Sequence, residues 1–300
     1  MLDQLISDLG KHVKVIKMDG NDGSAALQSV LDDENITAVI LTGRGIIKSP
    51  ILVKQKCDIY GLNADLLVED DIEAFKFETG GIRIKGINFY AVKEQGTSEY
   101  KNQCAVNMGR TLDNSIAECL FEGFGFCAIA HSKAVGRHQG NRISNCVFKN
   151  NSIGFAAFER GEYNQLTQCT LYNNNIAIHI QGGNTNISGC IISDNEIGIR
   201  ITEGDNHGHG VITGRSINHN DKPFVIHNVT YGFIINGCPI YCGDLVLESA
   251  RYIKFSNCDL SHIRFHVRSS KDIYCSNCHM IRYDVDTDDK DSLIFTNCII

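Results

Sequence analysis

Paired carboxylates are the residues of this sequence whose spacing could support bond-breaking chemistry. Glu159 follows the short apolar segment IGFAA (153–157), and Glu203 and Asp205 follow the related segment IGIRI (197–201). Two carboxyl groups on either side of a glycosidic bond can hydrolyse it, one as the acid and the other as the base or nucleophile. These three residues are therefore the candidate catalytic groups, and their geometry depends on the elements that carry them.

Basic side chains surround these carboxylates and are candidates for binding a substrate. They are His179, Arg200, His207, His209, Arg215 and His219. Imidazole and guanidinium groups donate hydrogen bonds to hydroxyl and carboxylate oxygens. The HGH spacing at 207–209 is a weak metal-binding signal, so we expect no metal and no cofactor.

The elements that carry these residues belong to a repeat that reads apolar, small polar, Asn/Gly/Gln, Cys, any residue, apolar. Its copies are IAECLF (116–121), ISNCVF (143–148), LTQCTL (166–171), ISGCII (187–192), ITGRSI (212–217), INGCPI (235–240), FSNCDL (255–260), CSNCHM (275–280) and FTNCII (295–300). Cys146, Cys169 and Cys190 are 23 and 21 residues apart, and the interval from Cys238 to Cys258 and onward is a constant 20. This period indicates stacked units that bury their apolar faces against one another.

Each copy predicts a strand, a sharp bend and a second strand. Asn or Gly at the third position suits the left-handed backbone of a bend. Stacking would align Cys146, Cys169 and Cys190 in a column inside the solenoid, where a small, readily buried side chain fits. We therefore expect the 13 cysteines to be reduced core residues, and the CxxC at 275–278 to belong to the repeat rather than to a zinc site.

A second feature of the central coils is an asparagine three residues past the apolar end of each pattern. Its copies are Asn151, Asn174, Asn195 and Asn220. Equivalent asparagines in stacked coils can hydrogen-bond along the stack. The short strands that follow them should point Ala156, His179 and Arg200 outward in one column, because strand side chains alternate.

Charge and hydropathy exclude several classes of protein. A net charge of −7 argues against a nucleic-acid partner. No apolar run approaches the ~18 residues of a membrane span, so membrane insertion is not expected. The N-terminus, MLDQLISDLGKHVKVIKMDG, lacks the apolar core and cleavage site of a signal peptide. Reduced cysteines agree with folding in a cytosol.

The N-terminal segment carries a resemblance to a known group of proteins. VIKMDGNDGSAALQSVLDD (15–33) gives an Asp-Gly turn and a short amphipathic helix, and ITAVILTGRGIIKSPILVKQKCDIYGLN (36–63) gives strands separated by Gly turns. This order resembles the N-terminal cap of the pectate-lyase-like superfamily and, more narrowly, the β-helix of bacteriophage tailspikes. Residues 205–260 also look like phage tail β-helix sequence. The fold expected is an all-β right-handed parallel β-helix over 36–300, preceded by an N-terminal cap region with a short helix over 1–35.

The resemblance implies a virion tail protein, made in the host cytoplasm, that acts outside the cell at the host surface. It implies a homotrimer that associates with other tail proteins and binds a bacterial surface polysaccharide, often cleaving it by hydrolysis or elimination. The chain ends at FTNCII, in the middle of a coil. We therefore expect it to be a fragment, or to be capped by something else.

The repeat alignment also predicts the spacing of the candidate carboxylates. Glu159, Gly182 and Glu203 take one equivalent position, so the two glutamates would be two coils apart. With strands about 4.8 Å apart, their backbones would lie about 9.6 Å from each other. This is close to the ~6.5–9.5 Å that separates the carboxylates of inverting glycosidases.

The segment TEGDNHGHGVITGRSINHND (202–221) contains a longer connection, of nine residues from Glu203 to Ile212, against five in the coil before it. Longer turns project from a solenoid and form walls of its binding surface. Arg215 takes the place of the repeat cysteine, either as a site of function or strain or because a one-residue shift turns it outward. The chain has no Trp, so Phe158, Tyr163, Tyr172 and Tyr231 are the aromatic groups that could stack on sugars.

Three functions fit this sequence. The favoured one is a tailspike-like depolymerase of a bacterial surface glycan. The second is a non-catalytic receptor-binding or structural tail component. The third is a polysaccharide lyase outside phage, in which Arg200 and His179 would supply the base and the group that neutralises a uronate. A convergent pair of carboxylates in an exposed groove would distinguish the first function from the second.

Overall fold

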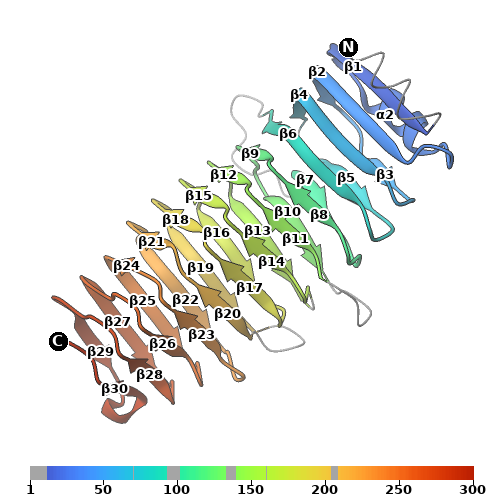
Figure 1. The fold of residues 1–300 in the computed structure, drawn as a ribbon. Coiled ribbons are helices and arrows are strands. Elements are labelled where there is room, and N and C mark those ends of the chain that lie inside the picture. The colour runs from blue at the N-terminus through green and yellow to red at the C-terminus, as the bar shows by residue number, and fades with distance from the viewer. Residues whose placement is uncertain (1–11, 70, 93–101, 133–139, 160, 204–208) are drawn as a thin grey trace.

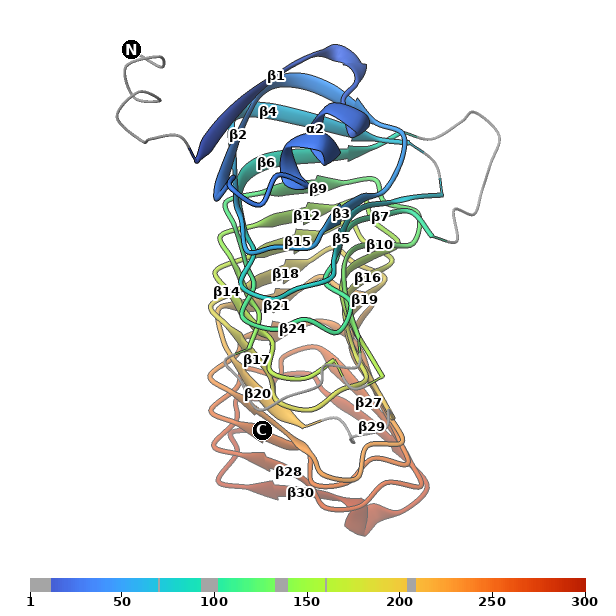
Figure 2. The same ribbon diagram turned by 90° about the vertical axis from the view of Figure 1, so that its right-hand side faces the viewer.

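The computed structural model describes residues 12–69, 71–92, 102–132, 140–159, 161–203 and 209–300, which wind into a right-handed parallel β-helix (Figures 1 and 2). Every strand pair in these ranges is parallel, and each partner lies one coil further along the chain. The prediction of an all-β parallel solenoid is confirmed. In Figure 2 the coils enclose a three-sided interior, and we number its faces 1, 2 and 3 in chain order.

Faces 1 and 2 belong to one continuous sheet. The strands that span both faces at the N-terminal end are β1 (Val13–Asp22), β2 (Ala38–Ile47), β4 (Asp58–Val68) and β6 (Arg83–Ala91). Face 1 continues through β8 (Ser115–Ala117), β11 (Arg142–Ser144), β14 (Gln165–Thr167), β17 (Thr185–Ser188), β20 (Gly210–Thr213), β23 (Phe233–Asn236), β26 (Lys254–Ser256), β28 (Ile273–Ser276) and β30 (Leu293–Thr296). Face 2 continues through β9 (Leu120–Glu122), β12 (Val147–Lys149), β15 (Thr170–Tyr172), β18 (Ile191–Ser193), β21 (Ser216–Asn218) and β24 (Ile240–Tyr241).

Face 3 is a separate sheet of 11 strands in the described part of the chain. Its strands are β3 (Ile51–Val53), β5 (Glu73–Phe77), β7 (Cys104–Asn107), β10 (Cys127–Ser132), β13 (Ile153–Phe158), β16 (Ile176–Ile180), β19 (Ile197–Thr202), β22 (Lys222–His227), β25 (Gly243–Glu248), β27 (Ile263–Arg268) and β29 (Asp284–Thr287). A 3₁₀ turn, η1 (Lys290–Ser292), follows β29.

The bend between faces 1 and 2 is made by a left-handed third residue in the described repeats except ITGRSI, where Gly214 lacks this backbone. Asn145 and Asn257 adopt φ of 52° and 53°, and Gly189 adopts 63°. Gln168 and Glu118 take the same left-handed backbone without being asparagine or glycine. The bend is therefore imposed by the stack as well as by local preference.

The interior is filled by the alternate residues that the repeat places inward. Cys146, Cys169 and Cys190 are buried in one column, and all 13 cysteines of the chain are free thiols, as expected. Phe89, Phe121 and Phe148 stack along the axis with ring centroids 5.1 and 5.0 Å apart. The coils are thus held to one another by continuous apolar contact as well as by backbone hydrogen bonds.

The asparagines at the bend between faces 2 and 3 form a hydrogen-bonded ladder. The amide Oδ1 of Asn174 accepts from the backbone N–H of Asn151 at 3.0 Å and from its Nδ2 at 2.9 Å. Asn195 accepts in the same way from Asn174, and Asn220 from Asn195. The predicted column is confirmed, and it satisfies buried polar groups that this bend would otherwise leave without partners.

One α-helix, α2 (Ser24–Leu31), follows β1 at the N-terminal end of the described chain (Figure 2). Its Leu27 and Leu31 are buried. The amide of Gln28 exchanges two hydrogen bonds with the backbone of Leu52, at 2.7 and 3.1 Å. No helix in the described ranges has the length and hydrophobicity that crossing a membrane requires.

Candidate functional site

The candidate catalytic residues are carried by the turns that lead from face 3 to face 1, which we call the 3–1 edge. Glu159 follows β13 and Glu203 follows β19, with β16 paired between these strands. The two exposed glutamates therefore occupy the same place two coils apart, as the alignment predicted. Asp205 and His207 lie outside the described residues.

Their backbones are fixed by the neighbouring coil. The N–H of Glu159 donates to the side-chain Oε1 of Gln181 at 3.1 Å, and its φ of 50° is left-handed. The N–H of Glu203 donates to the carbonyl of His227 at 3.2 Å. Each glutamate thus leaves the sheet in a defined direction at the 3–1 edge.

His179 and Arg200 lie opposite each other on the outer side of face 3, in the column that begins with Ala156. His179 is buried, its Nε2 lies 3.2 Å from Thr202 Oγ1, and its ring meets Phe158 edge-on at 5.6 Å. Burial, and then the nearby charge of Arg200, lower the pKa of His179 to about 4. His179 is consequently neutral at physiological pH, so its ring carries no charge with which to neutralise a uronate.

Arg215 and His219 lie away from this edge. Arg215 is exposed at the bend between faces 1 and 2, although its coil keeps the register that pairs Ile191 with Ser216. The side chain therefore turns outward without the one-residue shift that the sequence suggested. His219 is exposed at the end of face 2, with its ring 5.7 Å from that of Tyr241.

A groove of about 530 Å³ runs over face 1 beside the 3–1 edge. It crosses β17, β20, β23, β26 and β28 and is lined by Asn184, Asn186, His209, Gly210, Val211, Tyr231, Gly232, Ile234, Tyr252, Lys254 and Tyr274. Tyr231 and Tyr252 are 68% and 56% exposed, so their rings are accessible to a ligand. Exposed aromatic rings beside amide and imidazole groups are suited to sugars, which present apolar ring faces and hydroxyl groups.

The side-chain amide of Asn184 contacts both His209, which lines the groove, and Glu162, a carboxylate of the 3–1 edge. Asn184 donates from Nδ2 to Glu162 Oε2 at 3.3 Å, and its Oδ1 lies 3.2 Å from His209 Nε2. An ionised carboxylate only accepts, so Glu162 orients the amide with its oxygen toward the imidazole, and Nε2 must carry the proton. The imidazole of His209 is thus held in a defined orientation at the end of the groove.

The structure thus brings five of the predicted residues near one edge and adds several that the sequence did not single out. Glu159, Glu203, His179 and Arg200 lie at the ends of face 3, and His209 lies across the same turns. The additions are Glu162, Asn184, Tyr252, Lys254 and Tyr274. The repeat alignment carried a signal for the last two, because they are outward residues one place before the inward apolar residue of their copies.

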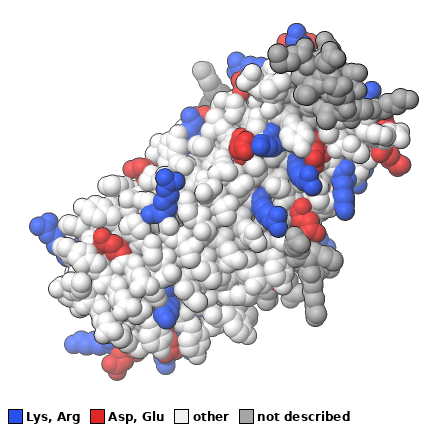
Figure 3. Space-filling view, viewed as in Figure 1, with Lys and Arg blue, Asp and Glu red and all other residues white. Residues whose placement is uncertain are grey.

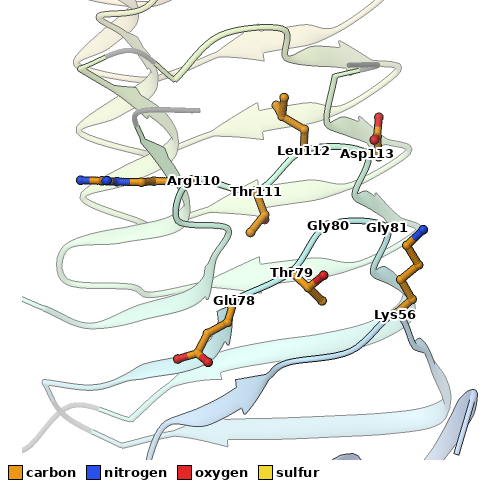
Figure 4. A pocket seen from close by; sticks show the side chains of 9 residues that line it. All are labelled: Lys56, Glu78, Thr79, Gly80, Gly81, Arg110, Thr111, Leu112 and Asp113. Carbon is orange, nitrogen blue, oxygen red and sulfur yellow. The ribbon is translucent and has the colours of Figure 1, made fainter. Parts of the chain in front are cut away.

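A second pocket, of about 320 Å³, lies in the N-terminal coils and is drawn in Figure 4. The backbone of Thr79, Gly80 and Gly81 runs along it, with Glu78 and Arg110 toward one end. Its other charged residues, Lys56 and Asp113, lie toward the opposite end. The two carboxylates do not converge, and no aromatic ring lines this pocket, so the face 1 groove is the stronger candidate.

The donor set also bears on metal chemistry. Across the described ranges, no three His, Cys, Asp or Glu side chains are grouped so as to hold a metal ion. Cys275 and Cys278 are both buried in the core.

Neither a protein-family model nor a curated protein matches this sequence. Solved structures do resemble its fold. The tailspike protein of E. coli bacteriophage HK620, in complex with a pentasaccharide, aligns with 100% of this chain and 67% of its own at a TM-score of 0.68 and 12% identity. The catalytic domain of a GH87 alpha-1,3-glucanase in complex with nigerose aligns with 96% of this chain and 69% of its own, at 0.58 and 13%.

The enzymatically active domain of bacteriophage CBA120 tailspike protein 2 aligns with 87% of this chain at a TM-score of 0.59 and 15% identity. The alignment spans 45% of that tailspike domain, so less than half of its length has a counterpart here. Identities this low establish the architecture alone. The chain has the right-handed parallel β-helix fold found in bacteriophage tailspikes and β-helix glycosidases, as the sequence resemblance predicted.

Proposed function

We propose that this chain binds a bacterial surface polysaccharide in the face 1 groove and depolymerises it with carboxylates of the 3–1 edge. The observation that carries the proposal is the groove itself, in which exposed tyrosines and His209 lie beside the turns that bear Glu159, Glu162 and Glu203. Its fold neighbours include a tailspike with a bound pentasaccharide and a glucanase with a bound disaccharide.

The catalytic assignment follows the position of each group. Glu203 and Asp205 precede His209 in the sequence, and Glu159 precedes Glu162. We assign the acid and base to Glu203, Asp205 and Glu159. We assign substrate contacts to His179, Arg200, His207 and His209, with Arg215 and His219 contacting a ligand only if it extends around face 2.

The proposal extends to assembly. We assign the chain to the virion tail of a phage, as a homotrimer with other tail proteins, acting outside the cell at the host surface. We also assign residues 1–35 to a cap, in which α2 covers the apolar end of the solenoid, and 36–300 to the β-helix that binds the glycan. The buried Leu27 and Leu31 support this role for α2.

A second function is favoured by one observation: among the described residues that line the groove, none is an aspartate or glutamate. A lining without carboxylates suits a receptor-binding protein that recognises a glycan and does not cleave it. The two functions differ in whether the carboxylates of the 3–1 edge reach the bound chain.

The test is a depolymerisation screen on capsule and lipopolysaccharide preparations that records both reducing ends and the absorbance of unsaturated uronates. Reducing ends without unsaturation indicate hydrolysis, and Glu203→Gln and Glu159→Gln should then abolish activity while leaving binding intact. The matched control is Glu196→Gln, an exposed glutamate at the opposite edge of the coil that carries Glu203. Binding without any cleavage across the panel would establish the second function instead.

A further inference from the structure

The groove on face 1 has a column of outward side chains along its floor. Val211, Ile234, Lys254 and Tyr274 lie opposite one another on β20, β23, β26 and β28, one on each successive coil. Val211 and Ile234 are both exposed although they are apolar. A ligand lying along this column therefore meets apolar contacts first and then the ammonium group of Lys254.

The wall beside this column is aromatic. Tyr231 and Tyr252 come from the 3–1 edge just before β23 and β26, so they flank Ile234 and Lys254. Tyr274 closes the column on the next coil. Lys254 thus shares the groove with three tyrosine side chains, whose rings can contact the sugar that carries a bound charge.

Some lysines of the described chain pair with carboxylates and others do not, and Lys254 is the unpaired one that lines the groove. Lys48, Lys85 and Lys149 lie 2.7, 3.0 and 2.9 Å from carboxylates of neighbouring coils. Lys254 makes no ion pair with any carboxylate in the part of the chain that the structure describes. In a protein with a net charge of −7, the groove therefore carries a cation that its own lining does not neutralise.

Two carboxylates of the described chain hydrogen-bond to lining residues at the two ends of the groove. Glu162 accepts from Asn184, and Asp272 Oδ1 accepts from the hydroxyl of Tyr274 at 3.4 Å. Neither residue lines the groove. In the view of Figure 3, charged side chains are also sparser over the C-terminal coils than over the N-terminal ones.

We propose that the groove selects a glycan that carries a carboxylate, such as a uronic or nonulosonic acid, and that Lys254 pairs with that carboxylate while the tyrosines hold the sugar rings. A single lysine supplies one positive charge, which matches the single negative charge of a carboxylate. This inference rests on the proposed function and names the substrate class of the same groove.

The experiment titrates the full chain with the methyl glycosides of glucuronate, galacturonate, mannuronate and sialic acid, and with the neutral glycosides of glucose, galactose and mannose. Binding is followed by saturation-transfer NMR at low salt. At least one acid should bind more tightly than its neutral counterpart, and added NaCl should remove the difference because an exposed ion pair is screened. Equal binding of each acid and its neutral counterpart, or the absence of any binding by the acids, would overturn the proposal.

Variants locate the effect. Lys254→Met should weaken binding of the acid by roughly two- to fivefold, the range of an exposed ion pair, and leave the neutral glycoside unchanged. Lys254→Arg should retain the preference, and Lys271→Met, an exposed lysine outside the groove, should have no effect. Tyr231→Ala should weaken acid and neutral glycosides alike. A Lys254→Met protein that binds the acid as tightly as the wild type would show that Lys254 does not bind the carboxylate of the sugar.

The depolymerisation screen and this binding test examine separate claims, so one can be contradicted while the other is supported. Cleavage of a neutral polysaccharide would leave the proposed function standing and remove the substrate class. A clear preference for the acid without cleavage of any polysaccharide would support the substrate class and contradict the proposed depolymerase function.

Discussion

Protonation of the buried histidines of this protein is unfavourable in the folded state. His131 on β10 lies opposite Ala157 and points into the interior, where it is fully buried. Neither ring nitrogen has a hydrogen-bond partner within the described residues. Burial lowers the pKa of His131 to about 4, and the nearby amide of Asn164 offsets only part of this effect. His179, on the outer side of face 3, also has a pKa of about 4 because of its burial.

The sign of the resulting pH dependence follows from linkage. An unfolded histidine has a pKa of 6.5, so below that pH the unfolded chain binds a proton that folded His131 does not bind until about pH 4. The free energy of unfolding should therefore fall as the pH drops from 6.5 to 4, by about 3 kcal/mol for this residue. Urea unfolding of wild type and His131→Leu at pH 7, 6 and 5 measures it, and the variant should lose this part of the slope.

The control for this prediction is His219→Gln, which changes an exposed histidine. It should keep the full acid dependence of the wild type. If His131→Leu and wild type lose stability in parallel as the pH falls, His131 does not contribute to the acid sensitivity.

Individual side chains show where sequence reasoning stops. The alternation of β-strands was enough to place His179 and Arg200 in one outward column. It could not show that Phe158 would pack against the ring of His179, because that contact depends on how side chains turn outside the repeat. The orientation of Arg215 was also open, and it is decided by the backbone of Gly214.

At the scale of the strand and its bend, Gly189 and Gly214 take the same place in consecutive repeats with different backbones. Gly189 has φ of 63°, and a Cβ there would lie 3.7 Å from its nearest neighbour, Gln168 Cγ. Gly214 lacks the left-handed φ, and a Cβ there would lie 2.2 Å from the carbonyl oxygen of Gly237. This altered bend explains why Arg215 leaves the column that cysteines fill in neighbouring coils.

The two glycines therefore predict opposite responses to one substitution. Gly189→Asn should change the free energy of unfolding by less than about 1 kcal/mol, because asparagine tolerates the left-handed region and has space there. Gly214→Asn should destabilise by at least about 2 kcal/mol, because the side chain collides with backbone. Thermal and urea unfolding of the two variants test this, and equal losses would mean that the bends are interchangeable.

The asparagine ladder is the second feature at this scale. Asn174 accepts from Asn151 and donates to Phe148, Tyr172 and Asn195. Asn174→Ala should destabilise by about 2–5 kcal/mol, because it leaves several buried donors and acceptors unpaired at about 1–3 kcal/mol each. The matched control is Asn175→Ala, since the neighbouring side chain is exposed. A similar loss in both variants would mean that the ladder does not stabilise the stack.

These elements also mark how far the repeat predicts the fold. It gave the two strands, the bend and the first asparagine ladder, because all of them recur at fixed spacing. A second ladder was not predicted, in which Asn114 donates to Asn141 Oδ1 at 2.9 Å on the 3–1 edge. Asn114 and Asn141 each stand two residues before a copy of the repeat, so the spacing held a signal for this ladder that the sequence analysis did not use. The connections that precede these residues vary in length, so the groove beside them could not be predicted from the repeat.

At the scale of the whole molecule, the groove inherits the spacing and the rigidity of the stack. It crosses five successive strands of face 1, so its floor is about 19 Å long at about 4.8 Å per coil. Each strand is hydrogen-bonded to the coils on both sides, and a solenoid of this kind cannot shorten the groove without breaking those bonds. A ligand must therefore match a length that is already fixed.

A fixed groove predicts how affinity depends on ligand length. For oligosaccharides cut from one polysaccharide that binds, affinity should rise with each added sugar until the chain spans the groove from Asn184 to Tyr274, and then level off. Ordering costs on the protein side are small because the strands do not move, so the gain per sugar should be similar at each step. Isothermal titration calorimetry with a length series measures this. Tyr274→Ala should shorten the length at which affinity levels off, because it removes contacts at one end only, whereas a uniform loss across all lengths would place the ligand elsewhere on the solenoid.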